Sequence, residues 1–235
     1  MRIEGVSIIT CTNKSQFIDN IFANYQSQLW RKKELIIILN NDSLDIETWK
    51  SKASSYPNVS VFQLQEHYSL GRCLNFGVHQ CKYHTIAKFD DDDYYSPYYI
   101  RSSMMAFRRT KADIVGRRSY FTYFEDDKSL YVRYPNRENS YQKYVAGGTI
   151  MFKRRVFRKV KFSDRSIGED FTFLDACRRK GFRIYATNRS HYVYIRRANP
   201  NHHTWRPTKR YLRGTGRFVA YTNDFRPFAV RARRV

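Results

Sequence analysis

The chain has 235 residues, and its 43 Lys and Arg against 21 Asp and Glu give a formal net charge of +22 at pH 7. This length predicts one domain with a sizeable core, and the 42% hydrophobic content argues against a disordered chain. The positive charge suits nucleic acid, an anionic membrane surface, or acidic small molecules and polymers, and it does not choose among them.

The cysteines and the chain start bear on the compartment. None of the four cysteines forms a C-x-x-C pair, which argues against a zinc site, and nothing indicates a disulfide framework. The first residues lack the apolar core of a signal peptide. No apolar run approaches the roughly 20 residues that span a bilayer. We therefore expect a cytoplasmic protein.

Apolar runs alternate with amphipathic segments through the first half of the chain. The runs predict strands over 6–10, 34–39, 59–64 and 85–89. Helices are expected from about 17 to 29, 45 to 54 and 70 to 79. The first helix should be capped by Asn13 and should bury an apolar face that ends at Leu29. This alternation predicts a parallel sheet with helices on both faces.

After Pro97 the pattern becomes mixed. Helices are predicted over 98–110 and 168–180, the second ending at Gly181. Strands are predicted over 113–116, 120–124, 130–134, 149–152, 183–186 and 192–195. The last 30 residues contain nine Lys or Arg and a single acid, Asp224.

Four consecutive carboxylates, Asp90 to Asp93, follow the strand expected over 85–89. Neighbouring carboxylates repel each other unless a cation neutralises them. Ligands of open α/β sheets bind at the carboxyl ends of the strands. We interpret the four acids as the site of a divalent metal that holds a phosphate, with a solvated surface loop as the alternative.

Two further polar groups fall at predicted strand ends, Thr10 with Thr12 and Asn40 with Asp42. In a parallel sheet these groups and the acidic run share one edge. A base and ribose would lie across the first two groups, with a diphosphate over the acids. Carboxylate and diphosphate oxygens are ligands that Mg²⁺ and Mn²⁺ prefer. No glycine-rich phosphate loop is present.

Six segments in order carry a resemblance to a known family. They are residues 6–13, Asn40-Asn41-Asp42-Ser43, Leu70 to Gly77 with its Asn-x-Gly ending, Asp90 to Asp93 with Pro97, Gly147-Gly148-Thr149 and Gly168-Glu169-Asp170. Together they resemble the GT-A-fold glycosyltransferases of family 2, which are inverting nucleotide-sugar enzymes, over about 6–205.

The resemblance implies an α/β fold, with a Rossmann-like, mostly parallel central sheet flanked by helices and a smaller acceptor-side sheet region. It also implies a single domain over 1–205. Residues 1–97 would form its nucleotide-binding half and 98–205 its acceptor half. Residues 206–235 would follow as a basic C-terminal tail.

The resemblance further implies roles for individual residues. The implied nucleotide-sugar contacts are Thr10, Thr12, Asn40, Asp42, Asn75, Asp90 and Asp91. Asp92 would be the main metal ligand, with Asp90 and His203 as the others, and Asp170 would be the general base. Three simpler interpretations remain open: Asp91 and Asp93 only hydrogen-bond the turn, Glu169-Asp170 caps a helix, and His203 packs on Trp205.

Three departures from the family pattern bear on specificity. Asn40 stands where an Asp commonly meets uracil, Leu74 replaces a frequent Arg, and the Q-x-x-R-W motif of processive membrane synthases is absent. The implied activity is metal-dependent, with Mn²⁺ or Mg²⁺. It is inverting transfer of one hexosyl-type sugar from a UDP- or dTDP-linked donor to a hydroxyl of a glycan or cell-surface polymer precursor.

Two other classes of function are kept as alternatives. One is a basic nucleic-acid-binding module, which four central acids disfavour. The other is a nucleotidyltransferase that uses carboxylates and two metals. If the chain is a glycosyltransferase, the basic tail is expected to recruit an anionic acceptor polymer or an anionic membrane leaflet, so that the protein lies peripherally at the inner membrane face.

Overall fold

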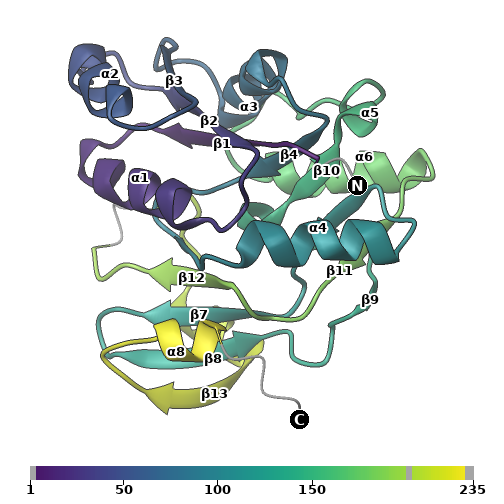
Figure 1. Ribbon diagram of the computed structural model, residues 1–235. Helices are drawn as coiled ribbons and strands as arrows, with labels where there is room; N and C mark the ends of the chain where they lie inside the picture. The colour runs from purple at the N-terminus through teal and green to yellow at the C-terminus, as the bar shows by residue number, and fades with distance from the viewer. Residues whose placement is uncertain (1–3, 200–202, 231–235) are drawn as a thin grey trace.

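The computed structural model describes residues 4–199 and 203–230. Over these residues the chain forms an eight-stranded sheet and a five-stranded sheet (Figure 1). In spatial order the large sheet contains β3 (Val59–Gln63), β2 (Lys33–Leu39), β1 (Val6–Thr12), β4 (Thr85–Lys88), β10 (Met151–Lys153), β6 (Ile114–Gly116), β11 (Ile184–Ala186) and β9 (Ser140–Tyr141).

The large sheet is mostly parallel, as predicted. β1 lies between β2 and β4 and pairs in parallel with both, whereas β10 is antiparallel to β4 and β6. The register sets Thr12 opposite Leu39 at the ends of β1 and β2. The carboxyl ends of β1, β2 and β4 therefore meet at one edge, where the predicted polar groups follow.

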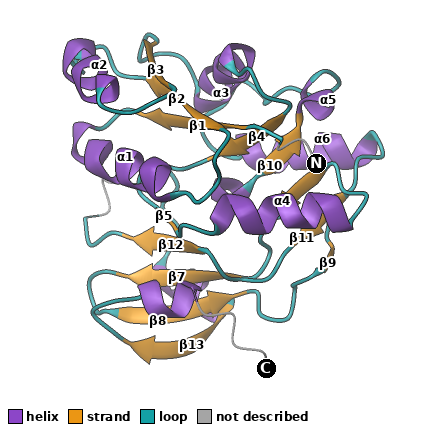
Figure 2. Cartoon of the chain, in the orientation of Figure 1, coloured by secondary structure: helices purple, strands orange, loops and turns teal. Residues whose placement is uncertain are grey.

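Helices cover both faces of this sheet because its strands are apolar on both sides (Figure 2). Ile8 packs in one core with α1 (Ile18–Ser27), α2 (Ile46–Ser54) and α4 (Tyr99–Arg109). Its neighbour Ile9 points the other way. Ile9 joins a second core with α3 (Leu70–Gln80), α5 (Arg154–Phe157) and α6 (Glu169–Arg179).

The helix ends show where local prediction succeeds. α6 ends as expected, with Gly181 at a φ of +80° and its N–H donated to the carbonyl of Arg178. The predicted cap and the predicted end of α1 were wrong, although its start was close to the prediction. A 3₁₀ turn, η1 (Ser15–Phe17), precedes it without a side-chain cap from Asn13. Leu29 lies beyond its last residue and is 58% exposed.

The second sheet lies below the first in Figure 1. Its order is β13 (Gly216–Tyr221), β8 (Ser129–Arg133), β7 (Tyr120–Phe124), β12 (Tyr192–Arg196) and β5 (Tyr94–Tyr95). On one face Phe121, Val132 and Val193 pack with Ala229 of α8 (Arg226–Val230). The alternate residues of these strands, Tyr120 among them, face a cleft between the sheets.

Residues 206–230, predicted as a basic tail, fold into this second layer. They form α7 (Lys209–Gly214), β13 and α8, and β13 pairs antiparallel with β8. Lys209 pairs with Asp126 and Asp127, and Arg213 also pairs with Asp127. Part of the positive charge of the segment is thus neutralised within the fold. No helix in the described part of the chain is long and apolar enough to cross a membrane.

His191 joins the two layers and makes stability depend on pH. Its carbonyl accepts a hydrogen bond from the N–H of Ser96, and its N–H donates to the carbonyl of Ala229. Its Nδ1 lies 2.9 Å from Ser96 Oγ. Burial, assisted by Arg117, lowers the pKa of His191 from 6.5 to about 4. The unfolded chain binds this proton at a higher pH than the folded chain does. Lowering the pH from 6.5 to 4 therefore reduces the contribution of His191 to the free energy of unfolding, by up to about 3 kcal/mol.

We predict that His191→Asn removes this pH-dependent part of the free energy of unfolding. Asn tolerates the φ of 76° at this position. Denaturant unfolding of both proteins between pH 7.5 and 4 measures it. The deficit of the variant relative to the unmodified chain should shrink as the pH falls. A deficit that is constant with pH would show that His191 does not titrate as the fold requires.

Candidate active site

A cleft of about 640 Å³ opens between the carboxyl edge of the large sheet and the second sheet. Of the predicted site residues, those that line it are Thr12, Asn40, Asp90, Asp91, Asp92, Asp170 and His203. They come from the ends of three parallel strands, from the first turn of α6 and from the segment after β12. The topology thus brings together residues that are far apart in the sequence.

Three predicted nucleotide contacts are not among the residues that line this cleft. Thr10 is 2% exposed inside β1. Asp42 accepts a hydrogen bond from the Glu66 N–H at 3.3 Å. The Asn75 amide donates to the carbonyl of Phe162 and accepts from its N–H, so it fixes the loop before α6. Asp42 and Asn75 thus have structural partners, and Thr10 is covered by neighbouring chain.

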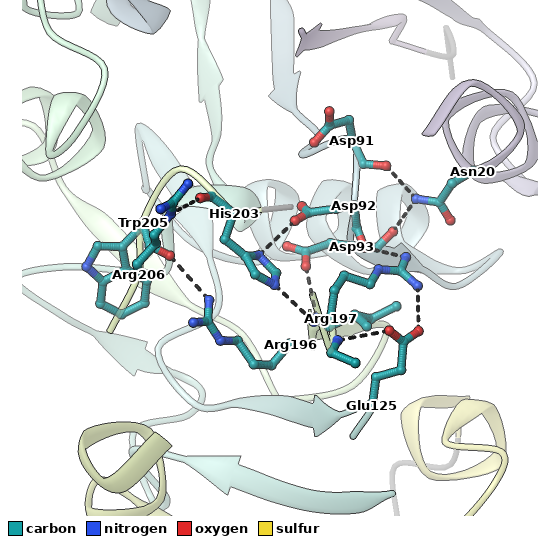
Figure 3. Close-up of polar contacts among 12 residues, drawn as sticks. Asn20, Asp91, Asp92, Asp93, Glu125, Arg196, Arg197, His203, Trp205 and Arg206 are labelled. Atoms are coloured by element: carbon teal, nitrogen blue, oxygen red, sulfur yellow. Dashed lines mark hydrogen bonds and ion pairs between the residues drawn. The ribbon is translucent and has the colours of Figure 1, made fainter. Parts of the chain in front are cut away.

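Each acid of the run has a different partner, so the run is not a solvated loop. Asp90 forms an ion pair with Lys88, and Asp91 accepts from Thr12 Oγ1 at 2.5 Å. Asp92 contacts His203, whereas Asp93 accepts from the hydroxyl of Tyr192 and the N–H of Ile195. The side chain of Asn20 donates to the carbonyls of Asp91 and Asp93 (Figure 3).

Crowding and burial shift the protonation of these acids. Burial, with the charge of Asp92, raises the pKa of Asp91 to about 7. Burial also raises the pKa of Asp90, although the ammonium of Lys88 opposes this. Asp93 is shifted furthest, well above its usual range, by burial and by Asp92. A cation bound beside these acids would let more of them ionise.

Lys88 is a site residue that the sequence analysis missed. It lies buried in β4, and although burial opposes its charge, Asp90, Glu169 and Asp170 hold its pKa above the usual value. The signal was a lysine inside an otherwise apolar strand, two residues before the first acid. Its ammonium links the acidic run to the start of α6.

The glycine pair Gly147-Gly148 leaves room for the carboxylates of Asp90 and Asp170 to approach the same turn. It lies in the 3₁₀ turn η2 (Gly147–Thr149). A Cβ on Gly147 would lie 2.0 Å from Asp170 Oδ2, and a Cβ on Gly148 would lie 2.7 Å from Asp90 Oδ2. Glycine is therefore required at both positions for Asp90 and Asp170 to rest against this turn.

Asp170 is not the N-cap of α6. That position is Gly168, at a φ of +78° and without a side-chain cap. One oxygen of Asp170 accepts from the N–H of Phe171 at 2.7 Å, and the other faces Gly147. The adjacent Glu169 is buried, and burial raises its pKa to about 7. Both acids line the cleft, but Glu169 is the more buried of the two.

His203 points at the acidic run (Figure 3). Its Nδ1 lies 3.1 Å from Asp92 Oδ2, and its Nε2 accepts the N–H of Arg197 at 2.9 Å. Its ring lies beside Tyr194. Arg197 also donates to the carbonyl of Asp92 and pairs with Glu125. This network fixes Asp92 from two sides, which the sequence spacing alone did not indicate.

Over residues 4–199 and 203–230, no group of three or more His, Cys, Asp or Glu side chains is arranged to hold a metal. Mg²⁺ commonly uses only one or two carboxylates and takes its other oxygens from substrate phosphates and water. Asp92, with Asp91 and Asp90 beside it in the cleft, fits a site of this kind, in which substrate phosphates and water complete the coordination of the metal.

Comparisons with known proteins agree with this fold. A sequence model of the family described as Glycosyl transferase family 2 matches residues 7–165. The O-antigen biosynthesis glycosyltransferase WbnJ of Escherichia coli is 26% identical over 165 residues, which cover 67% of this chain and 65% of that protein. Poly-beta-1,6-N-acetyl-D-glucosamine synthase of Staphylococcus aureus is 28% identical over 102 residues, or 42% of this chain and 25% of the synthase.

Solved structures show the same fold at low identity. Residues 1–349 of S. aureus TarS superpose with a TM-score of 0.65 at 13% identity, covering 81% of this chain and 60% of that one. The mannosyltransferase PcManGT from Pyrobaculum calidifontis, in complex with GDP-Man and Mn²⁺, gives a TM-score of 0.61 at 14% identity, with coverages of 83% and 57%. The family match, which spans most of the chain, and the shared GT-A fold show that this glycosyltransferase chain belongs to family 2.

Proposed function

We propose that this chain transfers one hexosyl-type sugar, with inversion, from a UDP- or dTDP-linked donor to a hydroxyl of a glycan or cell-surface polymer precursor. The proposal includes a requirement for Mn²⁺ or Mg²⁺. The observation that carries it is the Gly147-Gly148 turn, which holds Asp90 and Asp170 together beside Asp92. A metal on the leaving diphosphate and a base on the acceptor hydroxyl would then lie on either side of the same sugar.

The edge of the large sheet supplies the donor site in this proposal. Asn40 donates its amide N–H to the carbonyl of Gln65 at 2.8 Å. Its side-chain oxygen is thereby left as the acceptor at the cleft. Uracil and thymine carry an imide N–H that this oxygen would accept, which supports a UDP or dTDP donor in spite of the Asp usual here.

Asp92 is the principal residue that would hold the metal. A bound Mn²⁺ or Mg²⁺ would neutralise charge that develops on the leaving diphosphate. Because Nε2 of His203 accepts an N–H from Arg197, the neutral ring carries its proton on Nδ1 and donates it to Asp92. His203 thus orients Asp92 in this arrangement, and a role as metal ligand would require loss of that proton.

Asp170 is proposed as the general base. It would accept the proton of the acceptor hydroxyl as that oxygen attacks the anomeric carbon. It lies in the first turn of α6, with the ammonium of Lys88 nearby.

Neither alternative class of function gains support. A nucleic-acid surface would meet Asp90, Asp91 and Asp92 at the centre of the cleft. A two-metal nucleotidyltransferase needs carboxylates free to share between ions, whereas Asp90 is paired with Lys88. Recruitment of an anionic polymer or membrane leaflet by the exposed arginines of residues 206–217, and a peripheral cytoplasmic location, stay proposals.

We predict that Asp92→Asn loses Mn²⁺-dependent binding of UDP together with transfer. Asp170→Asn should retain UDP binding, while release of UDP from UDP-hexoses, or of dTDP from dTDP-hexoses, falls by about 10²–10⁴-fold. Calorimetry and a UDP-release assay measure the two effects. Asp42→Asn, outside the cleft, is the matched control and should change neither. Full Mn²⁺-dependent UDP binding by Asp92→Asn would refute the metal assignment.

Gly147→Ala tests the geometry of the base. The new methyl group would displace the carboxylate of Asp170, so transfer should fall by about 10²-fold while UDP binding persists. Gly214→Ala is the control, because nothing lies within 4 Å of a Cβ at Gly214. Equal rates for both variants would show that the position of Asp170 is not critical.

A further inference from the structure

The second sheet presents a buried guanidinium to the cleft. Arg133 of β8 lines the cleft but is only 1% exposed. Its Nε donates to Thr215 Oγ1 at 3.0 Å, and its two terminal nitrogens donate to the hydroxyls of Tyr120 and Tyr134 at 3.0 and 2.9 Å. All three acceptors are neutral hydroxyls, so they satisfy the hydrogen bonds of Arg133 without balancing its charge.

A second arginine lies against the same ring. The guanidinium carbon of Arg118 is 3.9 Å from the centre of the Tyr134 ring, and Arg118 also lines the cleft. Among residues 4–199 and 203–230, neither Arg118 nor Arg133 forms an ion pair with a carboxylate. Buried charges in proteins are ordinarily paired. Within the described residues, two cations around one tyrosine, one of them the buried Arg133, therefore have no carboxylate as counter-charge.

Aromatic side chains beside these arginines complete a binding surface. Trp205 is 44% exposed and Tyr211 is 48% exposed, and the guanidinium of Arg133 lies 6.0 and 5.3 Å from their ring centres. The pKa of the Tyr211 hydroxyl is lowered by its hydrogen bond with Tyr134 and then by Arg133. Flat, exposed aromatic rings suit the apolar C–H face of a sugar ring, and the positive charge beside them suits an anionic group on that sugar.

The surface lies on the acceptor side of the cleft. The donor edge, with Thr12 and Asn40, belongs to the large sheet, whereas Arg118 and Arg133 border β7 and β8 of the second sheet. The ring of Tyr120 is 5.9 Å from that of Tyr192, whose hydroxyl binds Asp93. The arginines thus lie beyond the acidic run as seen from the donor edge.

We propose that Arg118, Arg133, Trp205 and Tyr211 form a subsite for an acceptor saccharide that bears a carboxylate or phosphate group. The assignment rests on the proposed glycosyltransferase function and deepens it by naming the acceptor class. It places anion recognition inside the cleft, separate from the exposed arginines of residues 206–217. Arg118 contributes an accessible guanidinium, and Arg133 contributes fixed positive charge beneath it.

Small glycosides test the subsite on the full chain with UDP and Mn²⁺ present. Methyl β-D-glucuronide, glucose 6-phosphate and neutral methyl β-D-glucoside are titrated by calorimetry. An anionic probe should bind at least about tenfold tighter than the neutral one, because charge-assisted hydrogen bonds are the stronger kind. The tighter of the two anionic probes identifies carboxylate or phosphate as the group recognised.

Two variants locate the effect. Arg118→Gln should abolish the preference for the anionic probe and leave UDP binding unchanged. Arg217→Gln removes the same charge from an exposed position on β13 outside the cleft, and should keep the preference. This pair separates a local contact from general attraction to a basic protein.

The outcomes are distinguishable. UDP binding with no preference for either anionic probe would overturn the subsite alone, as would an equal loss in both variants. Weaker UDP binding in Arg118→Gln would reassign the arginines to the donor diphosphate. Absence of UDP binding in the unmodified chain would overturn the donor site, and with it the assignment of this surface to an acceptor.

Discussion

The charge of one buried lysine underlies the organisation of the cleft. Lys88 lies within a strand, where an unpaired ammonium would be costly, and carboxylates from two separate segments surround it. Asp90 and Glu169 are themselves buried enough to favour protonation. The ammonium and the carboxylates therefore stabilise each other's charged forms. Removing either partner would leave the other as an uncompensated charge in the core.

Each of the two sheets supplies one wall of the cleft around this ion pair. The large sheet ends its parallel strands at one edge and delivers Thr12, Asn40 and the acidic run there. The second sheet supplies the opposite wall, and α8 covers its far face. His203 and Arg197, from the end of β12, connect the walls through Asp92 (Figure 3). Negative groups thus occupy one side of the cleft and unpaired positive groups the other.

The sequence carried enough information for the large sheet and for the centre of the site. Alternating apolar runs predicted its strands, and four acids after a buried strand indicated the ligand edge. Thr10 was placed in the site because the first strand was predicted to end there, with Thr12 just beyond it. It lies two residues further inside β1, however, and neighbouring chain covers it. Such coverage depends on tertiary packing, which strand periodicity does not report.

The strands of the second sheet over 120–124, 130–134 and 192–195 were predicted, but its arginines and its last strand, β13, were not. In a chain with 43 Lys and Arg, a functional arginine such as Arg133 looks like its exposed neighbours. Residues 206–230 are short, basic segments, and β13 is stabilised mainly by pairing with β8. Local propensity is weak there, so charge composition suggested a tail where long-range strand pairing builds a sheet.

The turn at Gly147-Gly148 touches Asp170 on one side and Asp90 on the other, with no side chain between them. A substrate that shifts this turn as it binds must therefore move both carboxylates together. Donor and acceptor would then be energetically coupled through the backbone, and such coupling is reciprocal for the two affinities. Whichever ligand bound first would then set the shape of the turn that the other one meets.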